Sequence, residues 1–221
     1  MIDGTDGSGK ATQTKLLIEH MTREGLPVKT ISFPRYGQPS AAMVEAYLSG
    51  AFGRADEVGP KASSIFYAVD RFAASSAIRT WLENGVNVIA DRYVGSNMGH
   101  QGSKISDPNE RKAFYAWERE LEHDIFGIPR PDVNIILHVP YEISLTLMAG
   151  RAADGAEKHN LKTDIHQSDV NHLKAAEQTY LELAELYPEF TLVECTKAGS
   201  LLSPEEIHER VREIASKIVT P

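Results

Sequence analysis

The chain has 221 residues, 42% of them hydrophobic, and a formal net charge of −8 at pH 7. This length and composition exclude an intrinsically disordered protein and fit a single globular domain over residues 1–221 with one buried core. The acidic balance argues against broad binding to nucleic acid or to an anionic membrane, because both need a dense cationic surface.

Cysteine usage and the length of the apolar runs bear on the compartment. Cys195 is the only cysteine, so an internal disulfide is impossible. The start of the chain lacks the charged-then-apolar build of a secretory signal. No apolar run approaches the roughly 20 residues that span a bilayer. These features predict a cytoplasmic protein that does not act in a membrane.

Short apolar runs alternate with longer helical patterns along the chain, which is typical of βαβ units around a mainly parallel sheet. The expected strands cover residues 1–3, 27–33, 86–91, 132–139 and 190–195. The expected helices cover residues 11–24, 39–49, 60–84, 107–126, 141–151, 165–187 and 203–218. The first strand is unusually short, and we therefore expect the natural chain to begin a few residues earlier.

One helical pattern near the end of the chain has a clear apolar stripe. Its members recur at steps of three or four residues and are Leu173, Ala176, Tyr180, Leu183 and Tyr187. This spacing places them on one face of a helix, so we interpret them as core residues and not as a cofactor site.

The segment after the first expected strand has the spacing G-x-x-x-x-G-K, from Gly4 to Lys10. Glycines at these positions let backbone N–H groups turn around phosphate oxygens, and the lysine adds a point charge for the outer phosphates. Ala11 replaces the hydroxyl residue that usually follows the lysine and ligates magnesium. An ordinary glycine-rich turn is the alternative. The predicted ATP-binding residues are Gly4, Thr5, Asp6, Gly7, Ser8, Gly9, Lys10, Ala11 and Thr12.

An acidic residue follows the third expected strand, at the sheet edge where ligands of α/β proteins bind. Asp91 ends that strand and Arg92 comes next. We interpret Asp91 as a carboxylate that orients a magnesium-bound water, since Mg²⁺ keeps several waters and needs only one or two protein carboxylates. A turn with a surface ion pair is the alternative.

Four motifs in this order, "DGTDGSGKATQT", "FPRYG", "FYAVDR" and "DRYVGSNMGHQG", resemble the thymidylate kinase family. The resemblance covers nearly the whole chain. It implies a three-layer P-loop NTPase fold in which helices flank a five-stranded parallel sheet, with a short lid at residues 150–164. It also implies transfer of the ATP γ-phosphoryl group to dTMP to give dTDP and ADP, with Mg²⁺, and a homodimer through the helices at 60–84 and 107–126.

The resemblance assigns roles around the acceptor phosphate. Asp6 corresponds to an acid that faces the deoxyribose 3′-hydroxyl and the metal region. Arg35 and Arg92 resemble the two clamps of the acceptor phosphate, and Phe33 and Tyr36 are expected to line that pocket.

Further roles concern the base. Tyr67 resembles the aromatic on which thymine stacks, although Phe66 and Tyr67 also fit a helix core. Arg71 resembles the donor to a base carbonyl, and Asn97 and Gln101 resemble the side chains that read the base edge. His100 stands where many relatives have a tyrosine against the sugar, and we interpret it as a packing or hydrogen-bonding group.

The family supplies catalytic positive charge from either the phosphate loop or the lid. Gly7 occupies the loop position, which excludes the first arrangement. The lid carries Arg151, Lys158 and Lys162. Arg151 is the expected transition-state clamp, because a lysine lacks the planar fork that spans two oxygens. For the two lysines, a solvated charged loop is the alternative.

Two other functions remain open at this point. A kinase for another nucleoside monophosphate or for a deoxynucleoside would share the phosphate loop but not the other three motifs. A non-catalytic nucleotide-binding module would fit the missing hydroxyl at Ala11 and the lysines of the lid.

Overall fold

A computed structural model of the chain describes residues 1–153 and 170–219. Its main sheet has five parallel strands, as the family resemblance implies, and their order is β2-β3-β1-β4-β5. The strands are β1 (Ile2–Asp3), β2 (Val28–Ser32), β3 (Asn87–Asp91), β4 (Asn134–His138) and β5 (Phe190–Glu194). Each predicted strand is confirmed to within two residues.

The shortest strand, β1, lies at the centre of the sheet. Ile2 pairs with Asp91 of β3 on one side and with Ile135 of β4 on the other. The loops that leave the carboxyl ends of β1 and β3 therefore emerge side by side. This edge is where parallel α/β sheets place their ligands.

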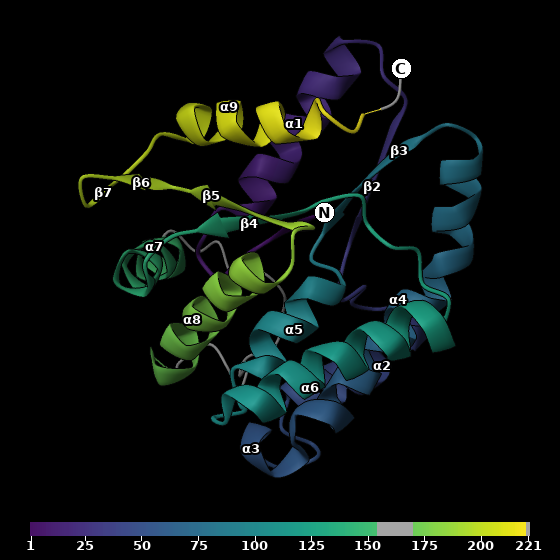
Figure 1. Cartoon of the computed structure of the whole chain (residues 1–221), viewed down its shortest axis with the longest axis vertical. Coiled ribbons are helices and arrows are strands. Elements are labelled where there is room, and N and C mark those ends of the chain that lie inside the picture. Colours follow the sequence, from purple (N-terminus) through teal and green to yellow (C-terminus); the bar gives the residue numbers. More distant parts are fainter. Residues whose placement is uncertain (154–169, 220–221) are drawn as a thin grey trace.

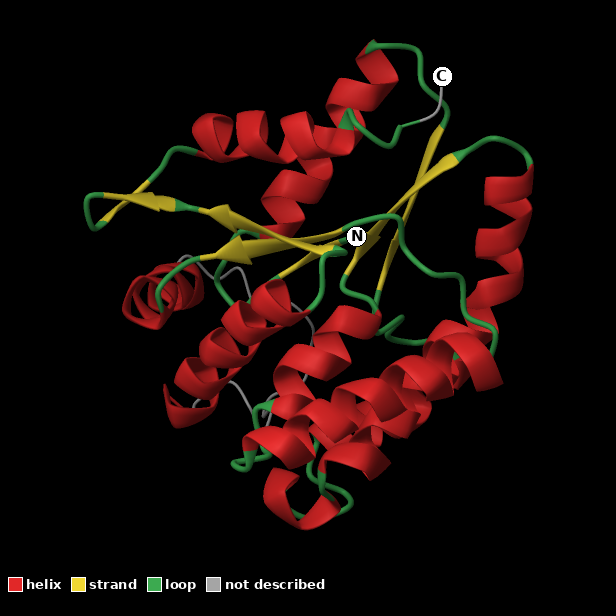
Figure 2. Ribbon diagram, viewed as in Figure 1, coloured by secondary structure: helices red, strands yellow, loops and turns green. Residues whose placement is uncertain are grey.

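Helices cover both faces of the sheet and give three layers (Figure 1). The helices are α1 (Lys10–Arg23), α2 (Ala42–Leu48), α3 (Ala55–Val58), α4 (Pro60–Glu83), α5 (Val94–Gly102), α6 (Pro108–Arg119), α7 (Tyr141–Ala153), α8 (Val170–Leu186) and α9 (Pro204–Ala215). Helices α1 and α9 lie together on one face, and α4, α5 and α8 contact the sheet or one another on the other face (Figure 2).

The core has one apolar cluster on each face of the sheet. The α1 and α9 side contains Leu17, Met21 and Val211, and the α4, α5 and α8 side contains Ile78 and Met98. A third, smaller cluster around Val44, Tyr47 and Leu48 lies apart from both. In the α8 stripe, Leu173, Ala176, Tyr180 and Leu183 are buried and Tyr187 packs against the core, which confirms the stripe.

Helix α5 was not predicted, because its glycines resemble a loop pattern. In the fold these glycines permit close packing. A Cβ atom on Gly99 would lie 2.4 Å from the ring of Tyr180, and one on Gly102 would lie 2.8 Å from Tyr115. The glycines are therefore required by the approach of α5 to α8 and α6, and not by a turn.

Other differences are smaller. The predicted helix 107–126 divides into α6 and a π-helical turn at Glu120–Ile125, and helix α3 and the hairpin β6 (Thr196–Lys197) and β7 (Ser200–Leu201) were not predicted. The predicted helix 165–187 is described only from Val170 onward. No helix in the described ranges has both the length and the apolar character to cross a membrane.

Candidate active site

The glycine-rich segment connects β1 to α1 as a loop with three glycines at positive φ, Gly4 at 138°, Gly7 at 88° and Gly9 at 91°. A Cβ atom on Gly4 would lie 2.6 Å from the carbonyl oxygen of Leu137. Gly9 precedes the first turn of α1, and no side chain caps that turn. The N–H groups at this helix end are thus available to an anion.

Two buried hydroxyl groups of the loop have no hydrogen-bond partner among the described residues. The side-chain oxygens of Thr5 and Ser8 are buried and make no hydrogen bond within the described residues. Buried polar atoms are seldom left unsatisfied in a protein. The loop therefore has the open donors that a bound phosphate would satisfy.

Lys10 lies against the loop with 8% of its side chain exposed. Its Nζ donates to the carbonyl oxygens of Gly4 (3.0 Å) and Thr5 (2.8 Å). Burial and the nearby charge of Arg92 lower the pKa of Lys10 to about 8. The lysine is therefore a partly desolvated cation at the position that the phosphate-binding motif requires.

Asp3 anchors the start of this loop, a role that the sequence analysis missed. Its fully buried carboxylate accepts hydrogen bonds from the backbone N–H of Gly4 (2.9 Å) and from the hydroxyls of Ser96 (2.8 Å) and Tyr180 (2.7 Å). Burial raises the pKa of Asp3. The only sequence signal was a carboxylate at the end of an apolar strand.

Arg92 brings the loop and the end of β3 together. Its backbone has a left-handed φ of 64°, and its side chain forms an ion pair with Asp6 and lies 2.9 Å from Nε2 of His100. Burial acts to raise the pKa of Asp6, but the charges of Arg92 and Lys10 outweigh it and keep the carboxylate ionised. Burial and the charge of Arg92 lower the pKa of His100, so its ring is neutral.

Asp91, the second predicted metal residue, lies half-buried at the end of β3. Its negative charge acts to raise the pKa of both Lys10 and Arg92, and the charge of Asp6 acts in the same direction. No group of three or more potential metal ligands occurs within the part of the chain that the structure describes. Two carboxylates are nevertheless a donor set that suits Mg²⁺, whose remaining ligands are water and phosphate oxygens. The carboxylate chemistry is compatible with Mg²⁺, and the metal role of Asp91 and Asp6 stays a prediction.

Arg35, the other predicted phosphate clamp, is held by Asp70 of α4. Its Nε donates to Oδ1 of Asp70 (3.0 Å), and its Nη2 donates to the hydroxyl of Ser40 (2.8 Å). Nη1 makes no hydrogen bond to any described residue. The guanidinium is thus oriented with one nitrogen left for a ligand.

Of the aromatic residues predicted around the acceptor, Phe33 is buried in the core and packs on Tyr93, with ring centroids 5.8 Å apart. Tyr36 and Tyr67 are half-buried against the small cluster around Tyr47. Phe66 packs between Phe52 and Tyr47, and it is half-buried like Tyr67, so neither of the two adjacent aromatics is a fully buried core residue.

The predicted base-reading residues are almost completely buried. Arg71 is 1% exposed, Asn97 2% and Gln101 3%. The acidic neighbours of these residues were not predicted. The guanidinium of Arg71 donates two hydrogen bonds to the carboxylate of Glu122, both 2.6 Å long. The amide oxygen of Gln101 lies 2.7 Å from the hydroxyl of Ser63.

The predicted lid lies almost entirely outside the described residues. Helix α7 extends through Arg151 to Ala153, but the side chain of Arg151 is not described. Lys158 and Lys162 lie in the undescribed segment. Their predicted roles therefore stay predictions.

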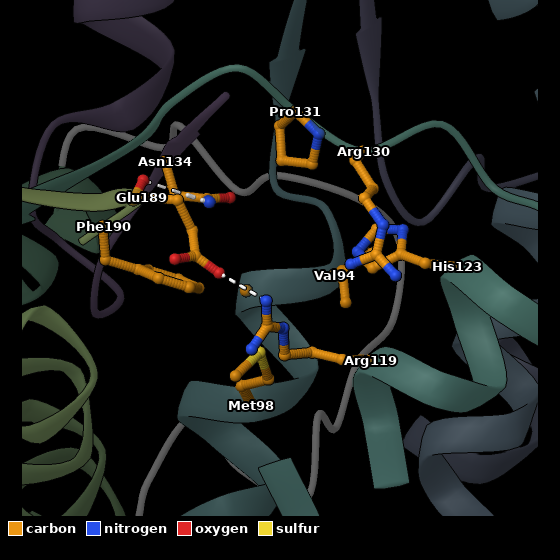
Figure 3. Close-up of a pocket in the computed structure, with 10 residues that line it drawn as sticks. Val94, Met98, Arg119, His123, Arg130, Pro131, Asn134, Glu189 and Phe190 are labelled. Atoms are coloured by element: carbon orange, nitrogen blue, oxygen red, sulfur yellow. Dashed lines mark hydrogen bonds and ion pairs between the residues drawn. The ribbon is translucent and has the colours of Figure 1, made fainter. Parts of the chain in front are cut away.

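A separate cavity of about 210 Å³ lies at the amino ends of β4 and β5, where Asn134 and Phe190 line it (Figure 3). Arg119 and His123 also face it, and Arg119 forms an ion pair of 2.9 Å with Glu189. None of the predicted site residues lines this cavity. It belongs to the edge of the sheet opposite the phosphate loop.

The fold and the loop together define a P-loop nucleotide-binding α/β protein in which an arginine, Arg92, forms an ion pair with Asp6 of the phosphate loop. The family profile described as "Thymidylate kinase" matches residues 2–215. The chain is 32% identical over 189 residues to a thymidylate kinase of Mycobacterium tuberculosis, covering 83% of this chain and 84% of that protein. It is 28% identical to a thymidylate kinase of Symbiobacterium thermophilum, covering 98% of this chain and 92% of that protein.

A third relative is a probable thymidylate kinase of Thermococcus gammatolerans, 28% identical and covering 96% of this chain and 92% of that protein. The chain belongs to the thymidylate kinase family. As a member of that family it is a nucleoside monophosphate kinase that phosphorylates dTMP, with ATP as the phosphoryl donor.

Proposed function

We propose that the transfer from ATP to dTMP takes place between the phosphate loop and the two arginines Arg35 and Arg92. The observation that carries this proposal is the contact of Arg92 with Asp6, which joins the donor loop to the end of β3. An acceptor phosphate held by Arg92 would lie directly beside the outer phosphates held by Lys10.

The reaction needs no covalent enzyme intermediate. An oxygen of the dTMP phosphate attacks the γ-phosphorus of ATP, and the bond from that phosphorus to the β–γ bridging oxygen breaks. The products are dTDP and ADP. Lys10 exchanges its loop carbonyl contacts for phosphate oxygens, and Arg35 and Arg92 hold the acceptor in line. Catalysis is positioning together with charge neutralisation.

Asp91 and Asp6 are the residues that would hold Mg²⁺. When bound, the ion neutralises charge on the β- and γ-phosphate oxygens. Ala11 offers no hydroxyl for this purpose, so the two carboxylates, water and the nucleotide would have to supply the ligands. Arg151 is the lid residue that we assign to the transition-state charge, with Lys158 and Lys162 as weaker contributors.

Tyr67, Arg71, Asn97 and Gln101 form the proposed base site. Tyr67 supplies an aromatic face, and the other three supply hydrogen-bonding groups to the base edge. His100, neutral and adjacent to Arg92, would contact the sugar or support that arginine.

We also propose that the protein is a homodimer through α4 and α6. Ile65, Val69 and Phe72 are 40%, 40% and 52% exposed and recur at helical spacing on one face of α4. A continuous exposed apolar stripe of this kind suits an interface with a second copy. The cytoplasmic location remains a prediction from the sequence.

The decisive experiment is a coupled assay of ADP release with dTMP, dUMP, dCMP, dGMP and thymidine as acceptors. We expect the highest kcat/KM with dTMP and loss of turnover when a chelator removes Mg²⁺. Faster turnover of another acceptor would reassign the substrate. Tight ATP binding without turnover of any acceptor would contradict a kinase function and favour a non-catalytic module.

A further inference from the structure

Two acidic side chains, Glu118 and Glu122, lie behind the proposed base site and have no exposed surface. Glu118 belongs to the last turn of α6, and Glu122 belongs to the π-helical turn that follows. In this turn Glu122 faces α4, whereas its neighbour His123 lines the separate cavity at the amino ends of β4 and β5 (Figure 3). Single π-helical turns are frequent at functional sites.

Glu122 binds one edge of the Arg71 guanidinium. Its two carboxylate oxygens accept hydrogen bonds from Nε and Nη2 of Arg71. This fork-to-fork geometry fixes the plane and the direction of the guanidinium. Nη1 makes no hydrogen bond within the described residues, so the group that remains for a ligand is an N–H donor.

The same acid constrains the amide of Asn97. Its Nδ2 lies 3.1 Å from the carbonyl oxygen of Ser64, 3.2 Å from Glu122 Oε1 and, at a long 3.5 Å, from Glu118 Oε2. The carbonyl oxygen of Ser64 and the Glu122 carboxylate that binds Arg71 are acceptors, which determines which end of the amide faces them. The carbonyl end, Oδ1, makes no hydrogen bond to the described residues and remains as an acceptor.

The ionisation of the cluster agrees with this arrangement. Burial, together with the charge of Glu122, raises the pKa of Glu118 to about 8. Glu118 is therefore mostly neutral near pH 7. Glu122 forms the buried ion pair with Arg71.

We propose that Glu122 is a positioning residue that sets the donor and acceptor pattern of the base site by orienting both Arg71 and Asn97. The pattern is one N–H donor, Nη1 of Arg71, beside one acceptor, Oδ1 of Asn97. It matches a pyrimidine with a carbonyl at C4 and an N–H at N3, as in thymine and uracil. Cytosine carries an amino group at C4 and an acceptor at N3, so both contacts are mismatched. The proposal rests on the base-reading roles of Arg71 and Asn97.

The cost of the mismatch is large because the groups are buried. A site built around hydrogen bonds rejects an analogue that leaves its polar groups unpaired by far more than a missing methylene would. Loss of the orientation supplied by Glu122 would therefore reduce selectivity and weaken dTMP binding, while the ATP site, on the opposite side of the transferred group, would be unaffected.

The test compares Glu122→Gln with a matched control, Glu182→Gln. Glu182 also accepts a 2.6 Å hydrogen bond from an arginine Nε, that of Arg111, but lies outside the base site. We expect Glu122→Gln to raise the dTMP KM about tenfold or more, to leave the ATP KM unchanged, and to lower the preference for dTMP over dCMP in kcat/KM. Glu182→Gln should change none of these.

A second variant covers the case in which the buried amide prevents folding. Glu122→Asp keeps the charge and withdraws the carboxylate by one methylene, and we expect the same changes in smaller measure. An unchanged dTMP KM and an unchanged preference in a folded variant would overturn the proposal. A loss of stability or kcat alone would overturn it too, because it would indicate a purely structural role.

A double-mutant cycle separates this proposal from the role of Arg71. If Glu122 acts through Arg71, the variant Arg71→Ala with Glu122→Gln should raise the dTMP KM no further than Arg71→Ala does. Independent, multiplying effects would contradict positioning. If Arg71→Ala itself leaves the dTMP KM unchanged, the assignment of Arg71 in the base site fails, and the role of Glu122 fails with it.

Discussion

At the scale of single residues, the site combines charges that control one another. Asp6 is ionised because Arg92 and Lys10 surround it, and His100 is neutral because it is buried beside Arg92. Arg92 contacts Asp6 and His100 through different nitrogens, which a lysine cannot do. The electrostatic balance of the loop therefore depends on Arg92, which follows β3, and on His100 of α5 as much as on its own motif.

Lys10 leads to a prediction about pH. The pKa of Lys10 is about 8 in the free protein. Above that pH the lysine loses its proton and can no longer attract the outer phosphates. We expect kcat/KM for ATP to fall about tenfold per pH unit above about pH 8, since this parameter reports ionisations of the free enzyme.

Steady-state kinetics between pH 6.5 and about 9.5 would measure this decline. Lys104 is the control, because its pKa is also lowered to about 8 but its Nζ contacts Tyr47 and not the phosphate loop. Lys104→Arg should keep the same profile. A flat profile up to the highest pH would show that Lys10 does not need its charge.

At the scale of elements, the packing of α5 decides where several site residues lie. Arg92 precedes this helix, and Asn97, His100 and Gln101 belong to it. The helix approaches α8 so closely that the ring of Tyr180 occupies the space where a Gly99 side chain would be. Tyr180 also bonds to Asp3, so the same contact supports the phosphate loop.

The substitution Gly99→Ala tests this packing. The added methyl group would lie 2.4 Å from the Tyr180 ring, so α5 and α8 must separate. We expect the free energy of unfolding to fall by about 2 kcal/mol or more. Gly150→Ala is the control, because Gly150 lies in α7 with no atom within 4 Å of the added Cβ, and there a gain of up to about 1 kcal/mol is expected. Denaturant titration of both variants measures the difference, and equal effects would contradict the packing argument.

At the scale of the whole molecule, the exposed face of α4 predicts self-association. Val69 lies in the middle of the stripe formed by Ile65, Val69 and Phe72. We expect Val69→Glu to prevent dimer formation, because a second copy would have to bury the added carboxylate without a partner. Light scattering should give a mass twice the 24.4 kDa of the chain for the original protein and the single mass for the variant.

Leu82→Glu provides the control for this measurement. Leu82 is 44% exposed on the same helix but about 100° around the axis from the stripe. The Leu82→Glu variant should remain dimeric. A monomeric original protein, or dissociation by both substitutions alike, would contradict an interface on this face.

Much of the fold was predictable from local patterns. The five strands and the phosphate loop follow from short apolar runs and from the glycine and lysine spacing, which are properties of neighbouring residues. The helix α5 was missed, because Gly95, Gly99 and Gly102 weaken any local helical signal. Only the tertiary positions of Phe190, Tyr180 and Tyr115, against which Gly95, Gly99 and Gly102 pack, explain those glycines.

The candidate site likewise combines residues that the sequence predicted with residues that it did not. Arg71 and Asn97 were predicted from their motifs, and the roles of both stay predictions. Glu122 and Asp3 had no local signal, because a glutamate in an amphipathic helix and an aspartate at a strand end are common. Glu122 is 51 residues from Arg71, and Tyr180 is 177 residues from Asp3.

The sequence by itself determined the five strands of the main sheet, most of the helices, the phosphate loop and the family, because these depend on the identity and spacing of residues within short segments. The tertiary structure alone decided which carboxylate faces which cation, since burial gives each charge a large cost that only a specific partner can offset. The packing of helices that are distant in the chain determines which partner each charge meets. The orientation of the base-reading groups by Glu122 is therefore a property of the fold and not of any motif.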